Sequence, residues 1–182
     1  PMVNVNWFQA DDYCLWAGRR LLTEAEWEKA ARGTEGFLYP WGDGFDCKNG
    51  NFDDEILYNQ YVIPGGEGCD GYNRTAPVGS FTGDISVWGV KDLAGNVTEW
   101  VADIYGENFY LHSKIENPTG PENGDARVAR GGAWINSNIS LIRSADRYFY
   151  MPDRIKDYLG FRCGVSIPAD ANDPSEIVNF GN

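Results

Sequence analysis

The sequence predicts a single domain of mixed α and β structure (α+β), with two helices, short antiparallel strands and much irregular loop. Two stretches with helix-capping signals fall before Gly33, and regular periodicity is lost after it. The chain carries 22 glycines and 14% aromatic residues, a mixture that favours loops held in place by rings. With 182 residues, 42% of them hydrophobic, it is long enough to build a core of its own.

The first helix is predicted over residues 7–17. Asn6 can cap its first turn, and Gln9 stands three residues later as the partner of a capping box. Apolar residues then follow at roughly helical spacing. Gly18 stands where a glycine commonly ends a helix.

The second helix has a stronger start signal. Thr23 and Glu26 form a Thr-x-x-Glu capping box, and Trp27, Ala30 and Ala31 continue the apolar pattern. We expect this helix to stop near Gly33.

Beyond the second helix the sequence predicts short strands separated by loops. The expected strand segments are 75–81, 93–101, 128–134 and 159–165. Residues 135–142 and 148–151 are mixed in polarity and lack a period, so we interpret them as irregular loops displayed on a rigid scaffold. We assign residues 1–168 to the domain and 169–182 to a polar tail.

Charge and hydropathy limit the possible partners. The formal net charge of −12 argues against nucleic acid and anionic membranes, and it is compatible with a hard cation bound by oxygens. A solvated acidic surface would explain most of this charge equally well. The sequence has no apolar run near 18 residues, so it predicts no transmembrane helix, and no signal peptide is visible.

The four cysteines are Cys14, Cys47, Cys69 and Cys163, and none forms a Cys-x-x-Cys pair. Because His112 is the only histidine, a zinc site is disfavoured. Two disulfides fit better and imply an oxidising compartment, with four free thiols as the alternative. Cys47 and Cys69 flank a long irregular stretch, and we pair them on that position.

Many short motifs match one family in order. The segment from Arg20 to Glu28 reads Arg-Leu-Leu-Thr-Glu-Ala-Glu-Trp-Glu, with Leu22 where the family usually has proline. The other matching segments are Pro1–Trp7, Tyr39–Gly42, Asn51–Phe52, Thr75–Val78, Gly89–Val90, Asp92–Trp100, Arg130–Gly132, Arg143–Ala145 and Gly160–Cys163. The chain resembles the formylglycine-generating enzyme (sulfatase-modifying factor) family, whose fold is a variant of the C-type lectin fold.

The resemblance has consequences for the covalent organisation of the chain. It implies a disulfide between Cys14 and Cys163. The motif at Pro1–Trp7 falls in the interior of the family domain, so we expect this chain to be the C-terminal core of that domain. A fragment, a processed product, or a separate chain that completes the domain would each account for the missing N-terminal part.

The resemblance also implies calcium. The first set of positions that match family ligands is Asn51, Phe52, Asp70 and Tyr72. The second set is Asp92, Gly95, Val97 and Glu99. Alternating side-chain and backbone oxygens suit a hard cation. From the residues alone, the second set could equally be only a tight turn.

Catalysis is where the sequence departs from the family pattern. The formylglycine-generating enzymes resembled here use two cysteines, shortly after a Gly-Gly-Ser-Tyr motif, to bind copper(I). This chain reads Gly-Gly-Ala-Trp at residues 131–134 and has Asn136 where the first of these cysteines would stand. The related iron-dependent sulfoxide synthases need several histidines, which His112 cannot supply by itself.

We therefore predict an extracytoplasmic, calcium-stabilised, lectin-like binding module without catalytic activity. Its ligand would be a protein, a peptide or a glycan, bound by the surface of residues 135–158. The predicted ligand-binding residues are Asn136, Asn138, Tyr148, Tyr150 and Tyr158. Aromatic side chains supply rigid contact area there, although some of these rings could instead fill the core. Arg143, Arg147 and Arg162 are interpreted as scaffold ties.

Three other functions remain open from the sequence. The first is a metal-dependent oxidase or oxygenase of a divergent branch, for which Asp103, Glu107 and His112 are the available side chains. The second is a structural subunit of a cell-surface or secretion assembly. The third is a variable protein of a diversity-generating retroelement, since some of those proteins use this fold.

Overall fold

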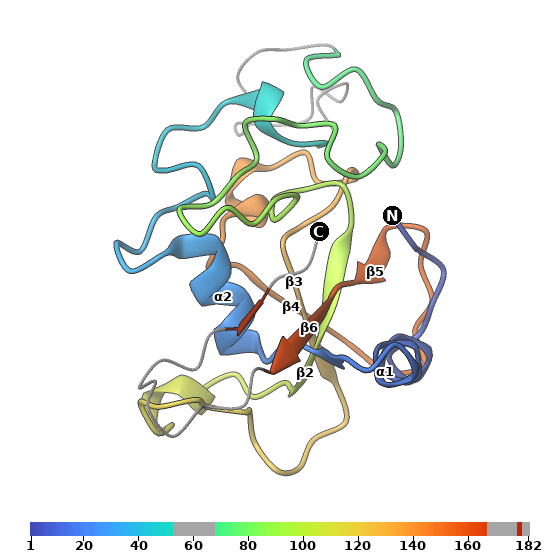
Figure 1. Cartoon of the computed structure of the whole chain (residues 1–182), viewed down its shortest axis with the longest axis vertical. Helices are drawn as coiled ribbons and strands as arrows, with labels where there is room; N and C mark the ends of the chain where they lie inside the picture. Colours follow the sequence, from blue (N-terminus) through green and yellow to red (C-terminus); the bar gives the residue numbers. More distant parts are fainter. Residues whose placement is uncertain (53–67, 167–177, 180–182) are drawn as a thin grey trace.

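The computed structural model describes residues 1–52, 68–166 and 178–179 (Figure 1). Its elements are α1 (Trp7–Trp16), β1 (Arg20–Leu21), α2 (Glu24–Arg32), η1 (Cys47–Asn49), β2 (Thr98–Ile104), η2 (Phe109–Leu111), β3 (Arg127–Arg130), η3 (Ile139–Ile142), β4 (Arg147–Tyr150), β5 (Leu159–Phe161), β6 (Cys163–Ser166) and β7 (Val178–Asn179). Most of the predicted tail lies outside the described residues, and its residues 178–179 form β7.

Both predicted helices are confirmed, together with the capping boxes that start them. The Asn6 side chain accepts from the Gln9 N–H at 2.9 Å, and the Gln9 side chain accepts from the Asn6 N–H at 3.0 Å. Thr23 and Glu26 form the same reciprocal pair in front of α2. These bonds satisfy main-chain donors that the first turn of a helix leaves unpaired.

Two small sheets organise the chain. The larger has the strand order β4-β3-β2-β5, and the smaller has the order β1-β6-β7. The pairs β2–β3 and β3–β4 are antiparallel, as expected, whereas β5 lies parallel to β2. The parallel pair was not predicted. Strands β4 and β5 run in the same direction at opposite edges of the sheet. The segment between them therefore returns to the end of the sheet at which β4 began, and β5 pairs in parallel with β2.

Several predicted strand boundaries were wrong. The segment 148–151, predicted as irregular, contributes to β4, because its three consecutive aromatic residues fit a pleated surface beside β3. No strand forms over 75–81, where Pro77 lacks an N–H and Gly79 has a positive φ of 74°. The segment 159–165 splits at Arg162 into β5 and β6, which pair with different sheets.

The helices cover opposite faces of the larger sheet, as Figure 1 shows. Trp100 and Ala129 pack with residues of α1, whereas Val101 and Val128 pack with residues of α2. This division follows from the alternation of side chains along a strand. Almost all of these side chains are fully buried, so the sheet is the centre of the core.

A third apolar cluster lies beyond the end of α2, among the loops at the top of Figure 1. Both predicted disulfides are present. Cys14 of α1 is bonded to Cys163 of β6, and Cys47 is bonded to Cys69. The first disulfide ties the N-terminal helix to the closing strand, and the second joins the two sides of the loop region that carries the first predicted calcium set.

Candidate functional site

The first predicted calcium set is organised around Asn51, whose side chain is fully buried. Its Nδ2 donates to the carbonyl of Arg74 at 2.6 Å and to Oδ1 of Asn96 at 3.2 Å. These two bonds fix the orientation of the carboxamide. Its Oδ1 has no hydrogen-bond partner. A buried oxygen without a partner is costly unless something else in the site binds it.

Asp70 brings the rest of this set together. Its carboxylate accepts from the backbone N–H of Phe52 at 2.7 Å and from that of Tyr72 at 2.8 Å. The four predicted residues therefore lie in one place, although they come from two sides of the segment 53–67. A carboxylate, an unpartnered carboxamide oxygen and nearby carbonyls are the donor types that a hard cation such as calcium requires.

The second predicted set packs directly against the first. Asn96 donates its backbone N–H to the carbonyl of Asn51 at 2.8 Å. Gly95 has a positive φ of 75°, and a Cβ at this position would overlap the Asn51 carbonyl and the Phe52 ring. Only glycine permits this approach without strain, so the loop of residues 92–99 and the loop of Asn51 form one packed unit.

The carboxylates of the second set are already engaged by protein groups. Glu99 accepts from the Trp27 indole at 2.7 Å and from two nitrogens of Arg162 at 2.6 and 2.8 Å. Asp92 accepts from the N–H of Gly79 at 2.7 Å. A guanidinium thus neutralises the charge of Glu99, and a calcium ion at this set would share that carboxylate with Arg162.

Sequence reasoning missed Asp84, which lies beside the second set. Its side chain is 1% exposed; Oδ2 accepts from the Ala94 N–H at 3.0 Å, and Oδ1 has no partner. Burial, together with the smaller effect of the nearby charge of Asp92, raises the pKa of the Asp84 carboxyl to about 8. Nothing in the turn-rich sequence around this aspartate distinguishes it from a surface residue.

The two asparagines of the predicted ligand surface shape its backbone. Asn136 accepts from the Ala133 N–H at 2.7 Å, and its own N–H donates to the Ala133 carbonyl at 2.9 Å, which closes a tight turn. Asn138 caps η3 by accepting from the Ser140 N–H at 2.9 Å. Ligand binding by either side chain would have to use its remaining hydrogen-bonding capacity.

The three predicted tyrosines are half-buried and pack against the cluster on the α1 side of the sheet. Tyr150 makes an edge contact with the buried ring of Trp100, with 5.8 Å between centroids. Burial raises the pKa of Tyr150 to about 12 and also raises the pKa of Tyr148. Tyr148, Tyr150 and Tyr158 are thus partly accessible to solvent and remain predictions as ligand contacts.

The most exposed apolar side chains of residues 135–158 were not among the predicted contacts. They are Phe149, Met151 and Ile155, each about half exposed. Trp134 is half-buried, and the Arg74 guanidinium lies over its ring at 5.3 Å. If residues 148–151 had been predicted as a strand, the alternation of side chains along it would have indicated that Phe149 faces the opposite side from Tyr148 and Tyr150.

Two of the three arginines tie the scaffold together. Arg162 binds Glu99, and Arg147 binds both carboxylate oxygens of Glu24 at 2.6 and 2.8 Å. Glu24 also lies 3.6 Å from Arg130, a fully buried arginine that contacts Glu28. The sequence gave no signal that Glu24 and Arg130 would be buried, because both belong to residue types that usually face solvent.

The three side chains considered for a metal-dependent oxidase come from β2 and from the loop after it. Asp103 lies on β2, whereas Glu107 and His112 lie in the loop that follows it. Within residues 1–52, 68–166 and 178–179, no three His, Cys, Asp or Glu side chains are grouped so that they could hold a metal ion. The two predicted calcium sets instead combine carboxylates with carboxamide and backbone oxygens.

Comparison with known proteins identifies the family. A model of the sulfatase-modifying factor enzyme 1-like domain matches residues 1–167, and the chain therefore belongs to this family. It is 38% identical over 171 residues to a formylglycine-generating enzyme of Thermomonospora curvata, covering 91% of this chain and 55% of that protein. It is 39% identical over 171 residues to the inactive C-alpha-formylglycine-generating enzyme 2 of Mus musculus, covering 91% of this chain and 49% of that protein.

Structural comparison agrees with the sequence comparison. The structure of PvdO from Pseudomonas aeruginosa superposes with a TM-score of 0.70 at 30% identity, covering 88% of this chain and 60% of that one. The chain spans about half the length of the curated relatives it matches. In the described part of the chain, we find no helix with the length and hydropathy needed to span a membrane.

Proposed function

We propose that this chain is a non-catalytic, calcium-stabilised binding module of the sulfatase-modifying factor family. The observation that carries the proposal is the state of its cysteines: all four are in disulfides, and Asn136 occupies the position of the first copper-binding cysteine of the enzymes it resembles. A disulfide sulfur cannot serve as a thiolate ligand. A relative whose name describes it as inactive, at 39% identity, is consistent with this proposal.

Calcium is proposed at the first set, because Asn51 has a buried oxygen without a partner and the Asp70 carboxylate binds the N–H of the next residue, Phe52. The ion would be bound by the side chains of Asn51 and Asp70 and by the carbonyls of Phe52 and Tyr72. Its role would be structural, because it would join the two sides of a loop already closed by the Cys47–Cys69 disulfide.

The ligand surface is proposed over residues 135–158, and its ligand would be a protein, peptide or glycan. Half-buried tyrosines with fixed rings and exposed apolar neighbours supply contact area at a small cost in entropy. We further propose an extracytoplasmic location, since two disulfides are stable in an oxidising compartment.

Elemental analysis of protein purified without added metal or chelator tests the first part of the proposal. We expect calcium in stoichiometric amount and no copper or iron. Stoichiometric copper or iron would refute the non-catalytic assignment and favour an oxidase.

Screens of peptide and glycan libraries then test the ligand surface. Tyr158→Ala should weaken the binding of any ligand found, whereas Tyr13→Ala, on the exposed side of α1, should not. Equal effects of the two substitutions would place the ligand elsewhere.

A further inference from the structure

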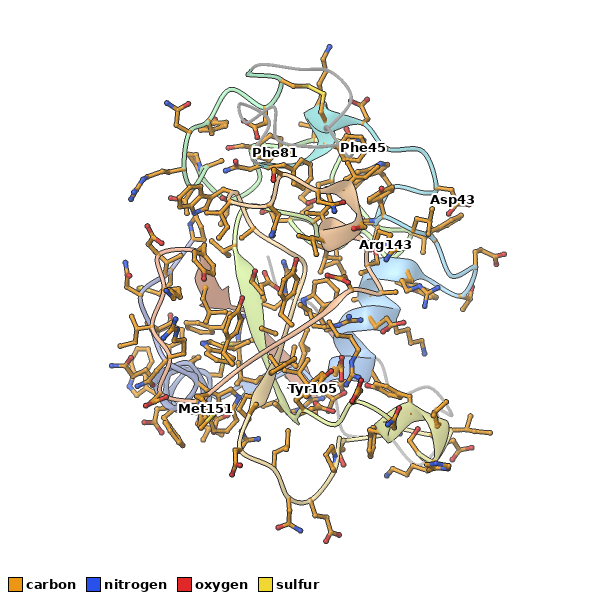
Figure 2. All side chains as sticks on the ribbon, turned by 180° about the vertical axis from the view of Figure 1, so that it is seen from behind. Asp43, Phe45, Phe81, Tyr105, Arg143 and Met151 are labelled. Atoms are coloured by element: carbon orange, nitrogen blue, oxygen red, sulfur yellow. A yellow bond between two sulfur atoms is a disulfide. The ribbon has the colours of Figure 1, made fainter. Side chains whose placement is uncertain are left out.

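Strand β4 is one edge of the larger sheet and lies within the proposed ligand surface. Its four residues pair with β3 in an unbroken register, from Arg147 opposite Arg130 to Tyr150 opposite Arg127. Apart from this pairing, no described segment makes a hydrogen bond to the main chain of residues 148–150. Within residues 1–52, 68–166 and 178–179, the N–H and C=O groups on the outer side of β4 therefore have no main-chain partner. Figure 2 shows the chain running from Arg143 to Met151 across the face turned to the viewer.

This edge lacks the features that normally protect one. Proteins discourage pairing at an edge with lysine, proline, bulges or an inward-pointing charge. Residues 147–150 read Arg-Tyr-Phe-Tyr, with no bulge against β3, and the charge of Arg147 is bound by Glu24. Phe149 is 53% exposed although its ring stacks on Tyr105 with 4.2 Å between centroids. The edge is thus aromatic, regular in its pairing with β3, and uncovered by the part of the chain that the structure describes.

We propose that β4 is a docking edge for an extended, cationic polypeptide segment, which would add to the sheet as a fifth strand. The inference rests on the proposed binding function and selects a peptide as its ligand class. Main-chain groups of the added strand would pair with the outer groups of β4. Its side chains would lie beside Phe149 on one face of the sheet and beside Tyr148 and Tyr150 on the other.

Charge decides between a peptide and a second copy of this chain. Each chain carries a formal charge of −12, so pairing of two copies through β4 would bring two strongly acidic proteins together. Carboxylates also flank the strand in sequence. Asp146 directly precedes Arg147, and Asp153 follows Tyr150 after two residues, whereas Arg143 and Arg154 are the exposed arginines nearest to these two carboxylates in the chain.

The test uses an acetylated, amidated peptide of alternating lysine and valine, followed by amide NMR of the whole protein. Two matched peptides serve as controls: one carries glutamate in place of lysine, and the other carries N-methyl groups on alternate backbone nitrogens. We expect only the unmodified lysine peptide to bind. Binding should slow the solvent exchange of those β4 amides that face away from β3, by about tenfold or more at saturation.

A pair of substitutions checks the location. Phe149→Lys places a like charge at the edge and removes an aromatic contact, so the lysine peptide should bind at least about fivefold more weakly. Ile115→Lys makes the same change of charge at a side chain that is 99% exposed and remote from β4 in sequence, and should leave binding unchanged. Because both sites are exposed, both variants should fold.

Each contrary result has a distinct meaning. Equal binding of the N-methylated peptide, or binding without protection of β4 amides, would overturn the docking edge while leaving a ligand elsewhere on residues 135–158. Outer amides already protected in the free monomer would show that the edge is covered. If protection of the β4 amides increased with protein concentration in the absence of peptide, the partner at this edge would be a second copy of the chain and not a peptide. Copper or iron in the protein would instead refute the proposed function itself.

Discussion

The carboxamide of Asn51 provides the sharpest test of the calcium proposal. Replacing it in Asn51→Ala removes the unpartnered Oδ1 and also the two bonds that Nδ2 donates to Arg74 and Asn96. The substitution therefore has two effects, which must be separated. One is the loss of internal hydrogen bonds, and the other is the loss of a ligand for the ion.

The magnitudes of these two effects follow from the structure. Two buried hydrogen bonds contribute about 1 kcal/mol each to the free energy of unfolding. Since 1 kcal/mol corresponds to about 2 to 4 °C in a domain of this size, the metal-free variant should melt about 4 to 8 °C below the wild type. Calcium at a thousandfold excess over its dissociation constant should add about 4 kcal/mol to the wild type. That gain corresponds to about 8 to 16 °C.

The assay is thermal unfolding in excess chelator and in saturating calcium, for the wild type and two variants. We expect the calcium-dependent rise in Tm to be lost in Asn51→Ala. The control Asn73→Ala changes an exposed asparagine of the same loop region and should retain the full rise. If Asn51→Ala kept that rise, the first set would not be the binding site. If the wild type showed no rise, calcium would not stabilise the fold.

Three further predictions concern stability. Glu24→Gln should lower the free energy of unfolding by about 3 to 5 kcal/mol, measured by urea denaturation, because it leaves buried Arg130 and Arg147 without their shared carboxylate. Burial raises the pKa of Asp103 to about 6, so the wild type should lose stability as pH rises from about 4 through 6. Asp103→Asn should accordingly be more stable at pH 8 by at most about 3 kcal/mol, with no gain near pH 4. Removing the Cys14–Cys163 disulfide, which spans 149 residues, should cost about 5 kcal/mol, against about 3 for Cys47–Cys69, which spans 22.

Controls separate these effects from general loss of structure. Glu35→Gln removes an exposed carboxylate just after α2 and should change stability little. For Asp103→Asn, a gain that did not depend on pH would refute the assignment of the effect to ionisation. For the disulfides, an equal cost for both cysteine pairs would contradict the dependence on loop length.

Local signals were sufficient for the two helices. Asn6 with Gln9, and Thr23 with Glu26, satisfy donors within three residues of one another, so their role is readable without a partner. The density of motifs also allowed the family, and with it the Cys14–Cys163 disulfide, to be recognised before any contact was known. Cys47 and Cys69 were paired from their positions on either side of an irregular stretch. The charge of −12 limited the partners but not the fold.

Strand pairing could not be read in the same way. Tyr148 to Tyr150 became a strand because β3 lies beside them, and the parallel pairing of β5 with β2 depends on where the chain returns. Pro77 lies in a segment that was predicted as a strand and forms a loop. Proline has no N–H to donate to a neighbouring strand, which disfavours a strand there. Pairing between distant segments is a property of the assembled sheet, not of the residues in one strand.

The sequence by itself determined the capped helices, the aromatic loop-rich composition, the absence of the expected cysteines after Gly132 and the residues matching a calcium site. Only the tertiary structure decided that Asn51 keeps a buried oxygen without a partner, that Glu99 is bound by Arg162, and that β4 is the edge strand of the larger sheet. Capping and composition act between neighbours along the chain. Burial, ion pairing and exposure of an edge depend on which distant segments meet, and that information exists only once the chain has folded.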